Sequence, residues 1–178
     1  MGLRLLFLLV LATTACYVSA ASAAHAKHVA AAAHLPALPE RSELPTGRCP
    51  VPAAYRDAFV RAADDTGLQL SMLVAVAQVE SEFKPHARSS AGAEGLMQVV
   101  PTTAQELKLD VRTPATNVLA GARYLELMLD RFARTDLALA AYNAGPTIVS
   151  RVGRAPNRES EAYVANVQAR WAALAGCT

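Results

Sequence analysis

The sequence predicts an all-α protein, and three observations point to that class. Alanine, the residue with the highest helix propensity, is abundant in the 178-residue chain. After residue 50, apolar residues recur at steps of three and four, as on one face of a helix, and no segment alternates as a strand does. Gly and Pro stand where the periodic segments end. We expect a compact bundle of about six or seven short helices around one buried helix.

The composition excludes two broad classes. With 53% apolar and only 18% charged residues, the chain does not have the composition of a disordered tail. A formal net charge of +2 offers no basic surplus for neutralising phosphates, so no nucleic-acid partner is expected. The length suits one folded domain.

Residues 1–23 have the pattern of a secretory signal peptide. Arg4 precedes an uncharged apolar run over residues 5–11, and small-x-Ala sites follow at 18–20 and 21–23. The run is short for a membrane span, although an uncleaved anchor helix is the alternative. We expect an exported protein, periplasmic or extracellular, that is not stably inserted in a membrane after cleavage.

Residues 24–48 are predicted to be a flexible tether that leads to a folded domain at 49–178. The segment is rich in Ala, Pro and His and has no sustained amphipathic period. Its His25, His28 and His34 suggest a metal site, but no rigid helix or partner ligand accompanies them. A solvated linker without metal is the favoured interpretation.

The three cysteines become an even pair once a signal peptide is removed. Cleavage takes away Cys16 and leaves Cys49 and Cys177, which bracket the folded domain. Outside the cytoplasm we expect them to form a disulfide, and two free buried thiols are the alternative.

The first helix of the domain is expected to start after Pro52 and to end at Gly67, since proline suits a first turn and glycine a helix end. The second helix is expected over residues 72–83, with Ser71 as its N-cap. It is apolar nearly all round, which indicates that it is the buried helix.

A loop over residues 84–95 separates these two helices from the rest of the domain. The later segments are a short helix from Pro101 to about 107, a long helix capped at Thr116 or Asn117 and running to 132, a helix over 137–143 that stops at Gly145, a turn or short helix over 147–152, and a last helix over about 160–174.

Glu80 is the most informative polar residue. It lies near the C-terminal end of the most apolar helix, where burial and the negative end of the helix dipole both raise the pKa of a carboxyl. A carboxyl that stays protonated near neutral pH can serve as a general acid. From spacing alone, a carboxylate pointing into water is the alternative, and Glu82 is expected to be solvated.

Four blocks of residues follow one another in the predicted domain. They are Glu80-Ser81, Ser89-Ser-Ala-Gly-Ala-Glu-Gly-Leu-Met-Gln98, Ala140-Ala-Tyr-Asn-Ala-Gly145 and Glu159-Ser-Glu-Ala-Tyr-Val164. In this order and spacing they resemble the peptidoglycan lytic transglycosylases, and the catalytic domain of the soluble lytic transglycosylases is the closest match. The resemblance covers about residues 55–168, and Ser160 stands where the family has Thr.

The resemblance implies a lysozyme-like α-helical fold with a saccharide groove and makes Glu80 the single catalytic acid and base. It places a set of substrate-binding residues along the groove: Ser89, Gly95, Met97, Gln98, Tyr142, Asn143 and Tyr163. Gly92 and Gly95 would let the backbone approach a sugar ring. Met97 would pack on an apolar sugar face, and Tyr163 would hydrogen-bond Glu80.

Each of these residues also has a structural interpretation. Met97 and Tyr163 suit a core, Ser89 suits a turn cap, and Tyr142 to Gly145 suit a helix C-terminus. A second carboxylate, which most glycoside hydrolases need, is not found, because Glu94 lies in the glycine loop and Asp110 in a turn.

The reaction that the resemblance implies is non-hydrolytic cleavage of the bond between N-acetylmuramic acid and N-acetylglucosamine, leaving 1,6-anhydromuramyl ends. It needs no metal and no cofactor. Peptidoglycan glycan strands are the expected partner, and a secretion or conjugation apparatus is a further candidate. The alternatives are a hydrolytic lysozyme on the same fold and a non-catalytic binding module of the cell wall or of a secretion apparatus.

Overall fold

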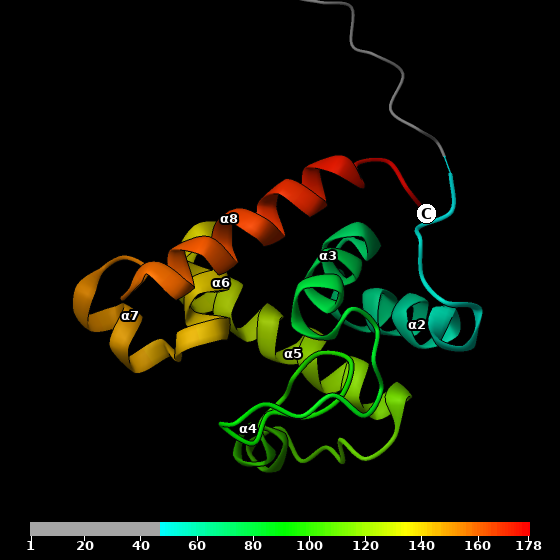
Figure 1. Ribbon diagram of the computed structural model, residues 1–178, viewed down its shortest axis with the longest axis horizontal. Helices are drawn as coiled ribbons and strands as arrows, with labels where there is room; N and C mark the ends of the chain where they lie inside the picture. Colours follow the sequence, from blue (N-terminus) through cyan, green and yellow to red (C-terminus); the bar gives the residue numbers. More distant parts are fainter. Residues whose placement is uncertain (1–46) are drawn as a thin grey trace, which may run out of the picture. The chain divides into compact units, whose positions relative to one another are not determined.

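The computed structural model describes residues 47–178, so the predicted signal peptide and nearly all of the predicted tether lie outside the described residues (Figure 1). Its elements are η2 (Ala53–Tyr55), α2 (Arg56–Thr66), α3 (Leu70–Ser81), α4 (Pro101–Glu106), α5 (Pro114–Phe132), α6 (Thr135–Ala144), α7 (Pro146–Val152) and α8 (Arg158–Ala173). Within residues 47–178 the only strand-like pairings are two isolated β-bridges. The predicted all-α class is confirmed. None of the helices in this range is long and apolar enough to cross a membrane.

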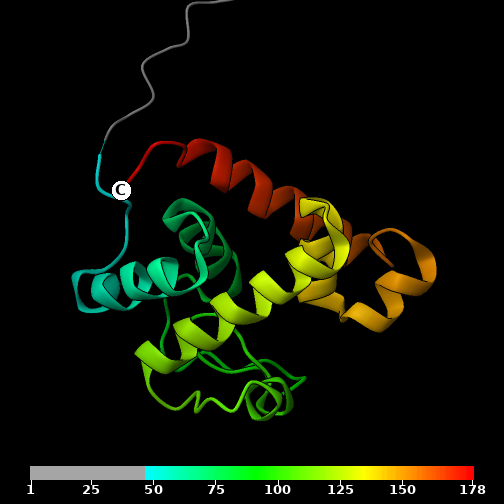
Figure 2. The same ribbon diagram turned by 180° about the vertical axis from the view of Figure 1, so that it is seen from behind.

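Helix α3 is the central helix of the domain. Figures 1 and 2 show it between α2 on one side and α6 and α8 on the other, with α5 crossing behind it in the first view and in front of it in the second. Residues 71–77 of α3 are all buried. The expectation of one buried helix is therefore confirmed.

The ends of α3 differ from the predicted ends by two residues. The N-cap is Gln69, and Ser71 is buried inside the first turn without a capping hydrogen bond. The helix ends at Ser81 because Glu82 and Phe83 adopt left-handed φ angles of 51° and 61°. This early end leaves Glu80 in the last turn, next to the loop that follows.

Other helix starts also differ from the prediction, and those of α5 and α8 are two of them. Helix α5 begins earlier, with Thr113 as an N-cap whose side chain accepts from the amide of Thr116. Asn117 is therefore no cap: it is 1% exposed and lies inside the helix. Helix α8 begins at Arg158, where the side chain of Asn157 accepts from the amide of Ser160.

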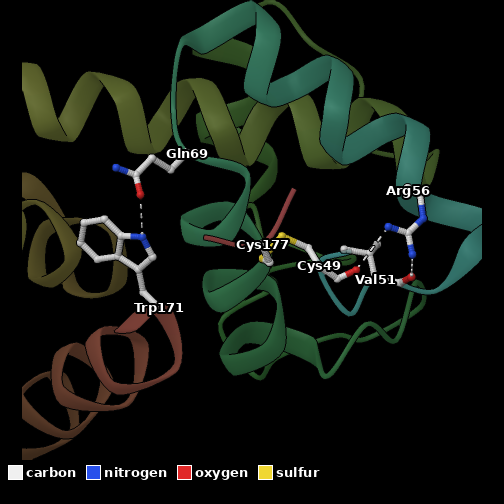
Figure 3. Close-up of a disulfide and its surroundings, with 6 residues drawn as sticks. All are labelled: Cys49, Val51, Arg56, Gln69, Trp171 and Cys177. Atoms are coloured by element: carbon white, nitrogen blue, oxygen red, sulfur yellow. Dashed lines mark hydrogen bonds between the residues drawn. A yellow bond between two sulfur atoms is a disulfide. The ribbon is translucent and has the colours of Figure 1, made fainter. Parts of the chain in front are cut away.

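The two ends of the folded domain are joined. Cys49 and Cys177 form a disulfide across 128 residues of sequence, as the sequence predicted (Figure 3). Beside it, the amide of Thr178 donates to the carbonyl of Gly47, and the amide of Cys49 donates to the carbonyl of Thr178. The guanidinium of Arg56 donates to the carbonyl of Cys49, so α2 is tied to the same junction.

A further link lies close to this junction. The indole nitrogen of Trp171 on α8 donates to the side-chain oxygen of Gln69 at 3.2 Å (Figure 3). Gln69 is the N-cap of α3, so the last helix holds the start of the central one.

We predict that replacing both Cys49 and Cys177 by Ser lowers the free energy of unfolding by about 4–5 kcal/mol, because the bond closes a very long loop in the unfolded chain. Denaturant unfolding of the oxidised protein and of the variant measures the difference. Equal stabilities, or two free thiols in non-reduced peptides of protein from an oxidising compartment, would contradict the prediction.

Candidate active site

A groove of about 530 Å³ opens at the C-terminal end of α3. Its walls come from the loop before α4, from α4 and α5, and from the ends of α6 and α8. The lining residues are Glu80, Ser89, Ser90, Ala91, Ala93, Gln98, Val99, Val100, Thr103, Tyr124, Tyr142, Asn143, Ala144, Gly145 and Glu159. All four sequence blocks contribute to this one groove.

Glu80 is held at the groove by a single strong contact. The hydroxyl of Tyr163, a buried residue of α8, donates to Oε1 of Glu80 at 2.6 Å. Burial raises the pKa of the Glu80 carboxyl from its ordinary 4.5 to about 7, although the Tyr163 hydrogen bond lowers it in part. Burial likewise holds the pKa of Tyr163 well above its ordinary value, so this hydroxyl keeps its proton and remains a donor.

The chemical consequence is a carboxyl that exists in both protonation states near neutral pH. Such a group can give a proton to a leaving oxygen and then, as a carboxylate, accept one from an attacking hydroxyl. The sequence-based alternative, a fully solvated carboxylate at position 80, is wrong. Glu82, two residues on, is exposed and pairs with Lys84, as expected for a solvated residue.

Two amide side chains present free hydrogen-bonding atoms to the groove. The Nε2 of Gln98 donates to the carbonyls of Ala87 and Gly95, which leaves Oε1 to accept from a ligand. The Oδ1 of Asn143 accepts from the hydroxyl of Ser160 at 2.6 Å, which leaves its amide group to donate. The groove therefore offers a positioned acceptor and a positioned donor.

Ser89 caps a turn and also lies on the groove lining. Its side-chain oxygen accepts from the amide of Ala93 at 3.0 Å and so caps a turn. The residue is also exposed on the groove lining. Tyr142 combines two roles in the same way, since it lines the groove while its hydroxyl donates to the carbonyl of Met97 at 2.8 Å.

Three predicted groove residues do not lie on the groove lining. Met97 is 0% exposed and belongs to the core, so its expected contact with a sugar face is wrong. Gly95 is buried as well, and a Cβ on it would come within 2.5 Å of the side-chain nitrogen of Asn117. The small size of Gly95 accommodates this side chain and not a sugar ring. Tyr163 is absent from the groove lining and reaches the site through Glu80.

Tyr124 and Glu159 are among the groove-lining residues that sequence reasoning missed. Tyr124 of α5 is half-buried and lines the groove, with its ring centroid 5.2 Å from that of Tyr142. In the sequence its spacing from Leu127 and Met128 is that of an apolar helical stripe, which does not distinguish a core residue from a groove wall. Glu159 is exposed on the groove lining. The sequence feature that could have identified Glu159 is its position at the start of the fourth block.

Glu159 is therefore the second carboxylate of the groove. Glu94 is paired with Arg88 at 2.9 Å and is not part of the lining. Asp110 is paired with Arg112 at 2.8 Å, and that pair lowers the pKa of its carboxyl. Neither is placed to act beside Glu80.

The described residues contain a second large depression, of about 700 Å³, at the turn between α2 and α3 and at the C-terminus. Asp64 is the one acidic side chain among the residues that line it. Between residues 47 and 178 no three His, Cys, Asp or Glu residues gather as a metal site. The groove at Glu80 is the better candidate for chemistry.

Comparison with known proteins connects the chain to one family. The sequence model of the family described as Transglycosylase SLT domain matches residues 57–164. The soluble lytic murein transglycosylase of Salmonella typhimurium is 34% identical over 144 residues, which cover 66% of this chain and 22% of that protein. The membrane-bound lytic murein transglycosylase F of Alcanivorax borkumensis is 38% identical over 99 residues, covering 51% and 21%.

Solved structures agree with the sequence comparison. Lytic transglycosylase Slt of Pseudomonas aeruginosa superimposes with a TM-score of 0.59 at 30% identity, over 71% of this chain and 25% of that one. The 70 kDa soluble lytic transglycosylase of Escherichia coli does so with a TM-score of 0.60 at 30% identity, over 68% and 24%. The fold expected from the resemblance is confirmed, although the chain spans only about a quarter of the length of these relatives. Since the family model covers more than half of the chain, the protein belongs to the transglycosylase SLT domain family.

Proposed function

We propose that the protein is a peptidoglycan lytic transglycosylase that cleaves the bond between N-acetylmuramic acid and N-acetylglucosamine without water. The observation that carries the proposal is Glu80, a mostly buried carboxyl at a groove, with a pKa raised to about 7 and a tyrosine hydroxyl on one oxygen. The relatives' own names, lytic murein transglycosylases, support the same reaction class.

In the proposed reaction Glu80 acts twice. The protonated carboxyl gives its proton to the glycosidic oxygen as the bond from that oxygen to C1 of the muramyl residue breaks. The substrate's own N-acetyl group stabilises the cation that develops at C1. The Glu80 carboxylate then takes the proton of the C6 hydroxyl, whose oxygen bonds to C1. The product carries a 1,6-anhydro ring, and Glu80 is protonated again.

The other groove residues are proposed to hold the glycan. The free oxygen of Gln98 and the free amide of Asn143 suit hydroxyl and N-acetyl groups of the sugars. The rings of Tyr124 and Tyr142 supply a wall against which an apolar sugar face can pack. Ser89, which also lines the groove, adds a hydroxyl.

The glycan strand is the partner that this groove supports. From the sequence we propose that the protein is exported. The proposed parts are a signal peptide over 1–23, a tether over 24–48 and a catalytic domain over 49–178. The disulfide supports export, because such bonds persist in oxidising compartments. An association with a secretion or conjugation apparatus stays a prediction.

A hydrolytic reaction is the second candidate, and Glu159 is the observation that favours it. An inverting hydrolase uses a second carboxylate to activate water, and Glu159 lines the same groove as Glu80. Mass spectrometry of digested wall separates the two reactions, because the hydrolysed product is heavier by one water. Products made only of anhydro ends, in the wild type and in Glu159→Gln, would exclude Glu159 as a water-activating base.

We predict that Glu80→Gln abolishes wall cleavage while the folded protein still binds glycan. Gln cannot give or take the proton, so turnover should fall by more than the roughly 10²–10⁴-fold that one general acid or base contributes. The matched control is Glu82→Gln, since Glu82 is exposed and pairs with Lys84 away from the groove. A Glu80→Gln protein with a third of the wild-type rate would refute the assignment.

We also predict that Glu80 makes the wild type less stable as the pH rises from about 4.5 to about 7. Its pKa is higher in the folded than in the unfolded protein, so the folded state binds more protons in this window and unfolding is favoured as they leave. Glu80→Gln should thus gain stability over the wild type across the window, by at most about 3 kcal/mol. Thermal melts from pH 4 to pH 8 measure the gain, and a constant difference between the two proteins would show that the carboxyl is not perturbed.

Tyr163→Phe tests the hydrogen bond to Glu80. The hydroxyl stabilises the carboxylate, so its loss should raise the pKa of Glu80 further. We expect slower turnover and an alkaline limb of the pH–rate profile that moves up by about one pH unit, the equivalent of one hydrogen bond to a charged group. Tyr55→Phe, at the start of α2 and outside the groove, is the control. Profiles of Tyr163→Phe and wild type that coincide would leave Tyr163 as a packing residue only.

A further inference from the structure

Asn117 of α5 makes two hydrogen bonds that reach out of its own helix. Its side-chain nitrogen donates to the carbonyl of Glu94 at 2.8 Å, and its side-chain oxygen accepts from the amide of Met97 at 2.8 Å. The residue is 1% exposed. One buried carboxamide thus satisfies a donor and an acceptor of the loop over residues 94–98, where unpaired backbone groups would be costly.

Two other helices hold the same loop by buried side chains. The hydroxyl of Ser81, the last residue of α3, donates to the carbonyl of Leu96 at 2.8 Å. The hydroxyl of Tyr142 on α6 donates to the carbonyl of Met97 at 2.8 Å. Ser81 directly follows Glu80 in the sequence, so the loop and the carboxyl are fixed to the same turn of α3.

The packing around Asn117 leaves little freedom for another arrangement. Gly95 lies against the carboxamide so closely that a Cβ would approach the Asn117 side chain to 2.5 Å. One turn further along α5, a Cβ on Gly121 would come within 2.4 Å of the Cβ of Met97. The helix and the loop meet at these two glycines, and Asn117 is the side chain of α5 that bonds the loop there.

The loop in turn sets the position of Gln98. This residue has a left-handed φ of 47°, which costs energy for a residue with a side chain and persists only where its neighbours enforce it. Its amide donates to the carbonyl of Gly95 at 3.2 Å, and its side-chain nitrogen donates to the same carbonyl at 2.9 Å. Asn117 bonds the backbone of Glu94 and of Met97. These two residues lie one position before and two positions after Gly95.

We propose that Asn117 is a positioning residue of the reaction: its carboxamide fixes the 94–98 loop so that Gln98 faces the groove at Glu80. The proposal rests on the function proposed above. Asn117 itself does not line the groove, so it acts through the loop and not by contact with the glycan.

The variant Asn117→Asp gives this proposal a pH signature. A protonated Asp can donate to the Glu94 carbonyl and accept from the Met97 amide, as Asn does. An ionised Asp has no proton to donate and sets a negative charge against that carbonyl. The kcat/KM of Asn117→Asp should therefore stay within about threefold of the wild type at pH 5, where a buried carboxyl keeps its proton, and fall at least about tenfold below it by pH 8.

Other titrating groups do not imitate this signature. Burial raises the pKa of Tyr142 well above its ordinary value, so Tyr142 keeps its proton throughout the range. Glu94 is paired with Arg88. Glu80 titrates in both proteins. A negative charge at position 117 would raise the pKa of Glu80, which preserves the general acid at pH 8 and so does not imitate the expected loss.

The experiment measures kcat and KM on purified peptidoglycan for wild type, Asn117→Asp, Asn117→Ala and the double variant Cys49→Ser/Cys177→Ser, well below each protein's melting temperature. The last variant is destabilised without any change to the loop, so its kcat/KM should equal that of the wild type. Asn117→Ala should be impaired at every pH, with a lower kcat and a higher KM.

Three outcomes decide the proposal. Loss of kcat/KM in Asn117→Asp that grows with pH, in protein shown to be folded by circular dichroism, supports it. Lower melting temperatures with unchanged kcat/KM in both Asn117 variants would overturn it, since Asn117 would then be only structural. If the wild type cleaves no wall, the proposed function has failed separately. Titration with a soluble muropeptide then decides, and equal affinities of wild type and Asn117→Ala would overturn the positioning role.

Discussion

The burial of one carboxyl at the end of one helix is the constraint on which the rest of the structure depends. Helix α3 is surrounded by its neighbours, and it ends one residue after Glu80. The Glu80 carboxyl is therefore mostly buried in the protein and yet lines the open groove. Desolvation raises its pKa to about 7, and a single hydroxyl, that of Tyr163, keeps the increase within the range where the group can still ionise.

Because Glu80 lies at the end of α3, the chain beside it is irregular, and this segment has to be held in one conformation by other contacts. The segment between α3 and α4 has two isolated β-bridges and several turn hydrogen bonds, but no regular strand or helix. Side chains from other helices satisfy further backbone groups of this segment. Ser81, Asn117 and Tyr142 come from three helices and bond neighbouring backbone groups of the 94–98 loop. In the residues described, no buried side-chain nitrogen or oxygen is left without a partner. A fully satisfied polar network of this kind specifies one conformation.

The sequence predicted the features that depend on local chemistry. The apolar run of α3 identified the buried helix, the place of Glu80 at its end predicted a raised pKa, and the cysteines at the domain ends predicted the disulfide. The predictions that failed are those that depend on which residues a buried side chain contacts in the folded protein. The resemblance placed Met97 on the groove and helical spacing places Tyr124 in an apolar stripe, yet Met97 belongs to the core and Tyr124 lines the groove. Asn117 suits an N-cap because Asn is common at that position. Only the structure shows that its side chain bonds the loop that packs against α5.

The groove residues and the disulfide have opposite effects on the free energy of unfolding. Their placement in different parts of the domain follows from this difference. Above pH 7 the ionised Glu80 carboxyl opposes folding, because it is less well solvated in the groove than in the unfolded chain. The left-handed backbone at Glu82, Phe83 and Gln98 opposes folding as well. Of these residues Glu80 and Gln98 line the groove, whereas the disulfide joins the two ends of the folded domain and is not part of the lining. A covalent bond there stabilises the whole fold without contact with the groove. The groove can therefore keep a perturbed carboxyl and a strained loop in a domain of modest size.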